Sequence, residues 1–179
     1  PIYGLFACKK DYLRLMPGRI VGKTLDEDGN DAFTLTLSTR EQHIRRHRAT
    51  SNICSNETLI ALMGAMHMAL LGPEGLEKLA LRVAATTEVT KQAISGIPGV
   101  ELVDPKTPNF REFAVKLPGN AADAVAHMDA AGVLGGFPMG EWWDSMSSCL
   151  LIGCDERTTQ SDIDALVSAL MAWVEEVSA

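Results

Sequence analysis

The stretch Ser147–Val177, SSCLLIGCDERTTQSDIDALVSALMAWVEEV, decides the fold of this chain. It begins with an apolar run, Ser147–Cys154, whose length and composition are typical of a buried strand. An amphipathic run then extends from Thr159 to Val177, and Asp162 follows Thr159 at the spacing of a helix capping box. A strand followed by a helix with one apolar face predicts a layered α/β domain.

The sequence before this stretch continues the same alternation. Val100–Val103 and Phe110–Leu117 are predicted strands. Gly119-Asn120 opens a helix that runs through Ala130 and is closed by Gly132, and Val133–Phe137 is a further strand. The resulting order, β-β-α-β-β-α, predicts a small, mostly antiparallel sheet covered by helices.

Two helices are expected to precede this sheet. The first, Glu57–Leu71, carries an apolar stripe at helical spacing, which consists of Leu59, Leu62, Met63, Met66 and Leu70. Gly72-Pro73 ends this helix, and a second helix runs from there to Gly96. The two helices could also form one long bent helix.

The first 56 residues indicate short extended segments. Pro1–Ala7 is a predicted strand, Lys9–Met16 a helical turn, and Arg19–Leu25 and Ala32–Ser38 two strands. Asp28-Gly29 between these strands is a hairpin turn signal. Three strands are too few to hold a core of their own, so a domain boundary is expected near residue 56.

Composition limits the class of protein. The chain has 179 residues, of which 46% are apolar and 22% charged, which suits one ordinary core. The net charge of −7 disfavours binding to nucleic acid or to an anionic membrane. No apolar run of roughly 18 residues is apparent, so no membrane span is expected. Because the chain opens at Pro1 without an initiator methionine, we expect it to be a piece of a longer protein.

Cysteine usage indicates the compartment. The chain has four cysteines, of which Cys149 and Cys154 lie in an apolar run, and no cysteine pair has metal-binding spacing. Buried, reduced thiols predict a cytoplasmic protein. His43 and His47 are separated by one helical turn, but the arginines around them would repel a metal cation, so no metal site is expected.

The segment Arg40–Asn56 is the clearest candidate site. Its guanidinium groups are followed by small hydroxyl and amide side chains just before a predicted helix, an arrangement that suits a phosphate or carboxylate group. The candidate residues are Arg40, Arg45, Arg46, Thr50, Ser51 and Asn52, with Arg19 as a weaker addition. A solvated basic helix face followed by an ordinary cap explains the same pattern equally well.

Other motifs indicate structure more than chemistry. The chain has no nucleophile elbow, P-loop or catalytic carboxylate pair, so no catalytic residue is nominated. The glycines of Gly132–Gly136 do not fit a dinucleotide-binding motif, and a close approach of the backbone explains them better. Trp142-Trp143 indicates either a recognition surface or packing against the neighbouring helix.

Six blocks of this sequence are distinctive: Tyr3–Ala7, Met16–Gly22, Thr39–Arg46, Ala49–Cys54, Leu70–Gly75 and Gly135–Gly140. They resemble the α subunit (subunit 1) of decarboxylating glycine dehydrogenase, the P-protein of the glycine cleavage system. The REQHIRR and ATSNIC blocks are long and unusual in composition, and the resemblance covers essentially all 179 residues.

This resemblance implies the fold of pyridoxal phosphate (PLP) enzymes of fold type I, the aspartate-aminotransferase-like fold. Residues 1–56 would be the end of a truncated large domain, and residues 57–179 the small C-terminal α/β domain. A truncated large domain would expose apolar surface, so self-association of this piece is expected.

The resemblance also implies a function. P-proteins decarboxylate glycine with PLP and pass the aminomethyl group to the lipoyl arm of the H-protein. In the two-subunit form, a heterotetramer, the β subunit (subunit 2) holds PLP covalently through its lysine, and this chain alone would be inactive. Thr50, Ser51 and Asn52 would reach the partner's PLP phosphate, and the arginines would line the approach.

Two other classes of function fit the same residues. The chain could be a non-catalytic assembly or regulatory module that keeps the fold only as an interface. It could also be a free phosphate- or anion-binding domain that uses the basic segment.

Overall fold

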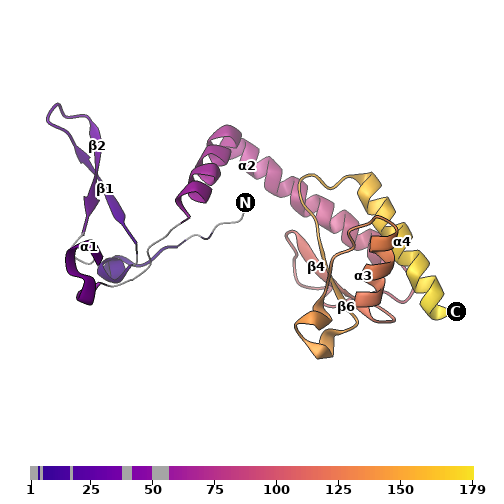
Figure 1. The fold of residues 1–179 in the computed structure, drawn as a ribbon. Helices are drawn as coiled ribbons and strands as arrows, with labels where there is room; N and C mark the ends of the chain where they lie inside the picture. The colour runs from indigo at the N-terminus through magenta and orange to yellow at the C-terminus, as the bar shows by residue number, and fades with distance from the viewer. Residues whose placement is uncertain (1–3, 5, 17, 38–41, 50–56) are drawn as a thin grey trace. The chain divides into compact units, whose positions relative to one another are not determined.

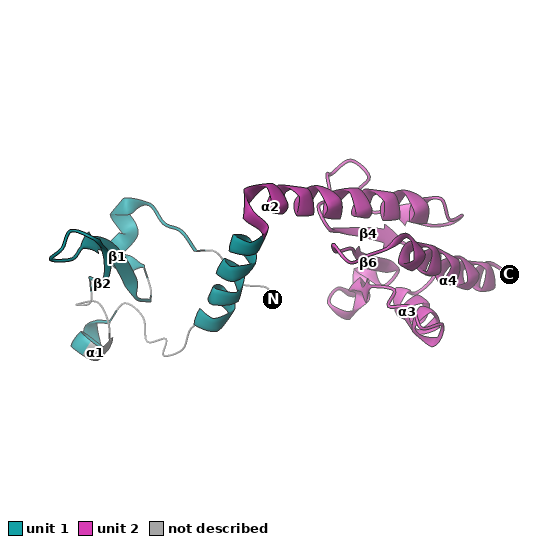
Figure 2. Ribbon diagram, turned by 90° about the horizontal axis from the view of Figure 1, so that it is seen from above, with its two compact units in different colours: residues 1–70 teal, residues 71–179 magenta. Residues whose placement is uncertain are grey.

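The computed structural model describes residues 4, 6–16, 18–37, 42–49 and 57–179. Two compact units make up the chain, Pro1–Leu70 and Leu71–Ala179 (Figure 2). The division after Leu70 follows the contacts within this chain and does not test where the domains of a longer protein would meet. The domain boundary expected near residue 56 therefore stays a prediction.

A β-hairpin is the main element of the first unit. Strands β1 (Ile20–Leu25) and β2 (Asp31–Thr36) pair antiparallel, as predicted. In the turn, the Asp26 carboxylate accepts hydrogen bonds from the backbone N–H groups of Asp28 (3.0 Å) and Asn30 (2.8 Å), and Gly29 has a φ of 81°. These bonds replace ladder partners that the turn residues lack.

Short helical turns complete the first unit. The 3₁₀ turn η1 covers Lys10–Leu15, and the basic segment contains α1 (Gln42–Arg45) and η3 (Arg46–Arg48). The predicted strand Pro1–Ala7 is wrong for its described residues, which have no regular structure. A strand needs a partner, and β1 and β2 pair only with each other.

Helix α2 runs from Thr58 to Ser95 and is broken at Gly72. Gly72 has φ 64° and ψ 179°, and Pro73 cannot donate a helical hydrogen bond. The prediction of two helices joined at Gly-Pro is therefore confirmed. The predicted apolar stripe of the first segment does not enter the core, because all five of its side chains are exposed in this chain: Leu59, Leu62, Met63, Met66 and Leu70.

Length and composition make α2 a candidate membrane span. Its most apolar 18-residue window has a mean hydropathy of 1.4 and is 6% buried, so the expectation that no segment is long enough is wrong. The segment after the break at Gly72, Pro73–Ser95, carries six charged side chains, and the segment before it, from Thr58 to Leu71, is only about 21 Å long. That is shorter than a hydrocarbon core of about 30 Å. We therefore keep the prediction of no membrane partner.

A four-stranded antiparallel sheet lies in the second unit (Figure 1). Its order is β3-β4-β6-β5, with the bounds β3 Glu101–Leu102, β4 Glu112–Lys116, β5 Phe137–Pro138 and β6 Cys149–Gly153. The predicted strand Val133–Phe137 is mostly wrong, since only Phe137 of it pairs with β6. Gly136, with a φ of 125°, turns the chain away from strand geometry just before Phe137.

Two capped helices, α3 (Ala121–Ala130) and α4 (Gln160–Ser178), follow the predictions closely. The Asn120 side chain accepts a hydrogen bond from the Ala122 N–H at 2.8 Å. Thr159 and Asp162 form a complete capping box, as their spacing predicted. Figure 1 shows both helices beside β4 and β6.

The core of the second unit lies on one face of the sheet. Phe113 and Val115 of β4 and Leu150 and Ile152 of β6 are buried on this face. They pack with side chains from the end of α2, from α3 and from α4, including Ile94, Ala124, Met128, Leu170 and Trp173. The opposite face, which carries Glu112 and Leu151, is only partly covered within this chain.

Candidate functional site

The basic segment presents its cations to solvent. Arg45 ends α1, Arg46 and Arg48 lie in η3, and all three side chains are exposed. None of them forms an ion pair with another residue of the described ranges. Exposed guanidinium groups without a carboxylate partner can bind an anion at low desolvation cost.

Four of the seven predicted site residues lie outside the described residues, namely Arg40, Thr50, Ser51 and Asn52. Arg19 lies directly before β1 and is exposed. The structure therefore describes Arg19, Arg45 and Arg46 as exposed and without an ion pair to any other described residue, and the assignment of all seven to an anion site stays a prediction.

The lysines do not form a second site. Lys91 of α2 is the one buried lysine in the described part of the chain. Its Nζ lies 3.1 Å from Asn109 Oδ1 and 3.7 Å from Glu88 Oε2, so the ammonium group is already satisfied. Within the described ranges, no group of three or more histidine, cysteine or acidic side chains could hold a metal ion.

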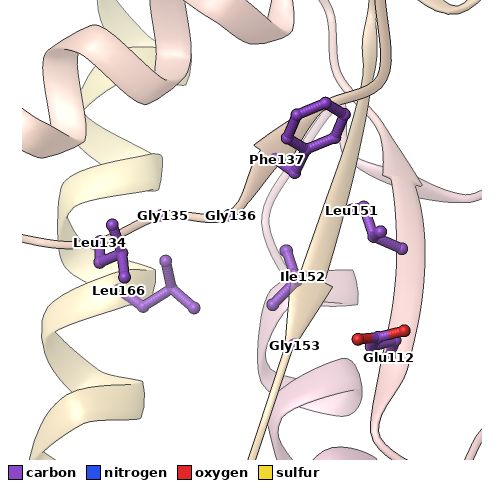
Figure 3. A pocket seen from close by; sticks show the side chains of 9 residues that line it. All are labelled: Glu112, Leu134, Gly135, Gly136, Phe137, Leu151, Ile152, Gly153 and Leu166. Carbon is purple, nitrogen blue, oxygen red and sulfur yellow. The ribbon is translucent and has the colours of Figure 1, made fainter. Parts of the chain in front are cut away.

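The glycine run before β5 borders a hollow of about 340 Å³ (Figure 3). Leu134 and Leu166 lie on one side of it and Glu112 and Leu151 on the other. A Cβ at Gly136 would collide with the Leu151 carbonyl oxygen, which confirms the prediction of a close backbone approach. The lining is apolar except for one carboxylate, so it offers no nucleophile or cation for catalysis.

Two tryptophans form an exposed aromatic cluster after β5. The Trp142 ring lies 4.6 Å from the Phe137 ring and 5.7 Å from the Trp143 ring, between centroids. Trp142 is 68% exposed and Trp143 51%. Their aromatic contacts are with Phe137 and with each other, and the choice between a recognition surface and packing against the neighbouring helix stays a prediction.

The buried cysteines behave as predicted. Cys149 and Cys154 are buried and free, and Cys154 Sγ lies 3.4 Å from Thr90 Oγ1. Cys8 is also free, but it is exposed, so the prediction of buried thiols does not hold for Cys8.

Nearly the whole sequence matches a known protein family. The model of the glycine cleavage system P-protein family matches residues 1–170. The chain belongs to the P-protein family. The sequence blocks that suggested this resemblance therefore indicated the family correctly.

Similar proteins carry the name of one subunit. The chain is 48% identical over 172 residues to a probable glycine dehydrogenase (decarboxylating) subunit 1 of Caulobacter sp. (strain K31). It is 41% identical over 172 residues to a protein of the same name from Geotalea daltonii. These matches cover 95% and 96% of this chain but 38% and 39% of the relatives, so the chain spans about two fifths of their length.

A solved structure confirms the fold class. The chain resembles a crystal structure of glycine decarboxylase (P-protein) of the glycine cleavage system in inhibitor-bound form, with 38% identity and a TM-score of 0.83. The match covers 93% of this chain and 37% of that one. The architecture is therefore part of a PLP enzyme of fold type I, and PLP dependence is a general property of the P-protein family.

Proposed function

We propose that this chain is part of subunit 1 of a glycine cleavage system P-protein. In the complete enzyme, glycine would lose its carboxylate as CO₂ and the aminomethyl group would pass to the lipoyl arm of the H-protein. The observation that carries this proposal is the similarity to relatives named subunit 1 of glycine dehydrogenase, together with the likeness in fold to a P-protein.

The described residues fit a role beside the phosphate of PLP. Arg45 and Arg46 present cations without a carboxylate partner in the described ranges, and Arg19 does the same at the start of β1. These groups would attract and orient the phosphate, while Thr50 and Asn52 would donate hydrogen bonds to its oxygens. Bound PLP supplies an electron sink for decarboxylation.

The cofactor lysine is proposed to come from a partner. Every lysine of this chain is exposed or, for Lys91, held by Asn109 and Glu88, but the chain spans about two fifths of its relatives' length, so these lysines alone do not locate the cofactor lysine. A β subunit (subunit 2) would supply it, in a cytoplasmic heterotetramer that also meets the lipoylated H-protein. The name "subunit 1" of the relatives supports the existence of a partner subunit.

A double variant of the full-length chain in its complex tests this proposal. Thr50→Ala with Asn52→Ala should weaken PLP binding by about tenfold or more, because two hydrogen bonds to the phosphate are lost. PLP absorbance titration measures this, and glycine–CO₂ exchange should fall in parallel. Light scattering must show an intact complex.

Matched controls separate an anion site from a structural role. Arg82→Ala removes an exposed arginine of α2 and should leave PLP affinity unchanged. Unchanged PLP affinity and exchange in the Thr50/Asn52 variant would contradict the proposed site. Binding of inorganic phosphate by this chain alone, without any lysine-bearing partner, would instead favour a free anion-binding domain.

A further inference from the structure

Glu141 and Asp144, which stand on either side of Trp142 and Trp143 in the sequence, line a second hollow of about 420 Å³. Trp142 follows the 3₁₀ turn η4 (Met139–Glu141), and Trp143 precedes the 3₁₀ turn η5 (Asp144–Met146). The hollow is lined by Asn120, Ala122, Pro138, Gly140, Glu141, Asp144 and Ser147. The four consecutive residues from Glu141 to Asp144 thus combine two aromatic rings with two carboxylates.

Backbone hydrogen bonds fix the turn that carries both rings. The N–H groups of Trp142 and Trp143 both donate to the Met139 carbonyl oxygen, at 3.2 and 3.1 Å, and the Met146 N–H donates to the Trp143 carbonyl oxygen at 2.8 Å. The Phe137 ring supports Trp142 from β5. An exposed aromatic pair on a preformed turn loses little conformational entropy on binding, which is typical of the anchors of protein interfaces.

The charges beside the rings are unbalanced. Neither the Glu141 nor the Asp144 carboxylate forms an ion pair with any residue of the described part of the chain. The second unit as a whole carries sixteen carboxylates against seven lysines and arginines, a formal charge of −9. A tryptophan face also attracts a cation through its quadrupole. The surface therefore complements a positively charged, partly apolar side chain.

We propose that the surface formed by Trp142, Trp143, Glu141 and Asp144 binds an arginine- or lysine-bearing segment of a different protein. The rings would pack against the apolar stem and the cationic group of that segment, and the two carboxylates would neutralise its charge. This inference does not depend on the proposed PLP phosphate site, which uses residues of the first unit.

Site-specific photo-cross-linking in the full-length chain tests the proposal. Ser145, which is exposed beside the cluster, is replaced by p-benzoyl-phenylalanine, so that both tryptophans stay in place. After irradiation in the cells that produce the protein, the cross-linked peptide is sequenced by mass spectrometry. We expect a segment of another protein with a lysine or arginine within a few residues of the linkage.

Variants of the two carboxylates test whether the surface recognises the positive charge of its partner. Glu141→Gln with Asp144→Asn should abolish the cross-link and weaken the affinity for the purified partner by about tenfold or more. Asp129→Asn with Glu156→Gln removes two exposed carboxylates elsewhere in the same unit. This control should leave the cross-link and the affinity for the partner unchanged. Raising the ionic strength should weaken binding of the unsubstituted chain but not of the Glu141/Asp144 variant.

The aromatic rings are tested separately. Trp142→Ala with Trp143→Ala should also weaken the affinity by about tenfold or more, with a nearly unchanged midpoint of thermal unfolding because both rings are exposed. The proposal is overturned by a cross-link to a second copy of this chain, to lipid, or to a segment without basic residues. It is equally overturned by the absence of a cross-link, or by one that survives in the Glu141/Asp144 variant.

Discussion

At the scale of single residues, two glycines near β5 share a positive φ but differ in their surroundings. Gly136 has a φ of 125° and faces the Leu151 carbonyl group, whereas Gly132 has a φ of 76° and open space around it. Any Cβ at Gly136 must displace the backbone of β6, a central strand. At Gly132, which closes α3, only the backbone conformation opposes a side chain.

We expect Gly136→Ala to lower the free energy of unfolding by about 2–4 kcal/mol, from backbone strain and the collision with β6 together. Gly132→Ala should cost about 1 kcal/mol, because only the left-handed conformation is penalised. Urea denaturation of the two variants measures the difference. Equal costs would mean that the approach of Gly136 to Leu151 is relieved without strain.

The capping box of α4 gives a pH-dependent contribution at the same scale. The Thr159 hydroxyl donates to Asp162 Oδ2 at 2.7 Å and the Thr159 N–H donates to it at 2.8 Å. These bonds hold the pKa of Asp162 below its ordinary value of 3.8. Below pH 3.8 the unfolded carboxylate therefore binds protons before the folded one does.

The folded state should lose stability as the pH falls from about 3.8 through the lowered pKa of Asp162. Thr159→Ala removes the largest cause of this lowering, so the loss of stability with acidification should be smaller in that variant. Thr159→Ser keeps the hydroxyl and should behave as the unsubstituted chain. Thermal unfolding followed by circular dichroism from pH 5 to pH 2.5 measures both, and identical pH profiles of the Ala and Ser variants would contradict the prediction.

At the scale of elements, the two segments of α2 differ in what their apolar side chains contact. After Gly72, the helix contributes Val83 and Ile94 to the buried residues of the second unit. Before Gly72, most apolar side chains are exposed, including Met68, which lies on the opposite side of the helix from the predicted stripe, and only Ile60 and Leu71 are half-buried. A helix that is apolar all round is normally buried, so this segment indicates an interface.

Leu62→Gln with Met66→Gln should leave the stability of this chain nearly unchanged, within about 0.5 kcal/mol, because both side chains are exposed. The same change should weaken assembly with the proposed partner subunit by about tenfold or more, since apolar contacts would be lost there. Analytical ultracentrifugation of the mixed subunits measures assembly. Leu81 is exposed in the second segment of α2, so Leu81→Gln is the control and should leave assembly unchanged.

At the scale of the whole molecule, the buried core is confined to the second unit. Every buried apolar residue of the described ranges lies between Val83 and Val174, whereas the hairpin leaves Val21, Phe33 and Leu35 exposed. A two-stranded hairpin without a covered face has little stability of its own in water. The first unit therefore needs apolar contacts beyond those that the described residues make.

We expect this 179-residue chain to self-associate when it is produced without a partner, because contact between copies would remove the exposed apolar side chains of the hairpin and of α2 from water. Light scattering should show a mass that increases with concentration. Addition of the proposed partner subunit should suppress this increase. A monomer at high concentration would show that these surfaces do not need covering.

Patterns local in sequence predicted most of the second unit. The capping box at Thr159, the helix start at Gly119-Asn120 and the strand Phe110–Leu117 each depend on neighbouring residues, so their prediction needs no knowledge of distant contacts. The predicted strand Val133–Phe137 failed because its pairing depends on how Gly136 approaches Leu151 of β6, which is far along the chain.

The amino-acid sequence by itself determined the type and order of the main elements, the hairpin turn, the break at Gly72-Pro73 and membership of the P-protein family, because these depend on local periodicity, turn chemistry and long sequence blocks. Only the tertiary structure decided which apolar faces are buried: Leu170 enters the core, whereas Leu62 and Trp142 stay exposed. The physical reason is that an apolar stripe shows only that a face prefers burial. Whether this chain or another protein covers it depends on contacts between distant residues.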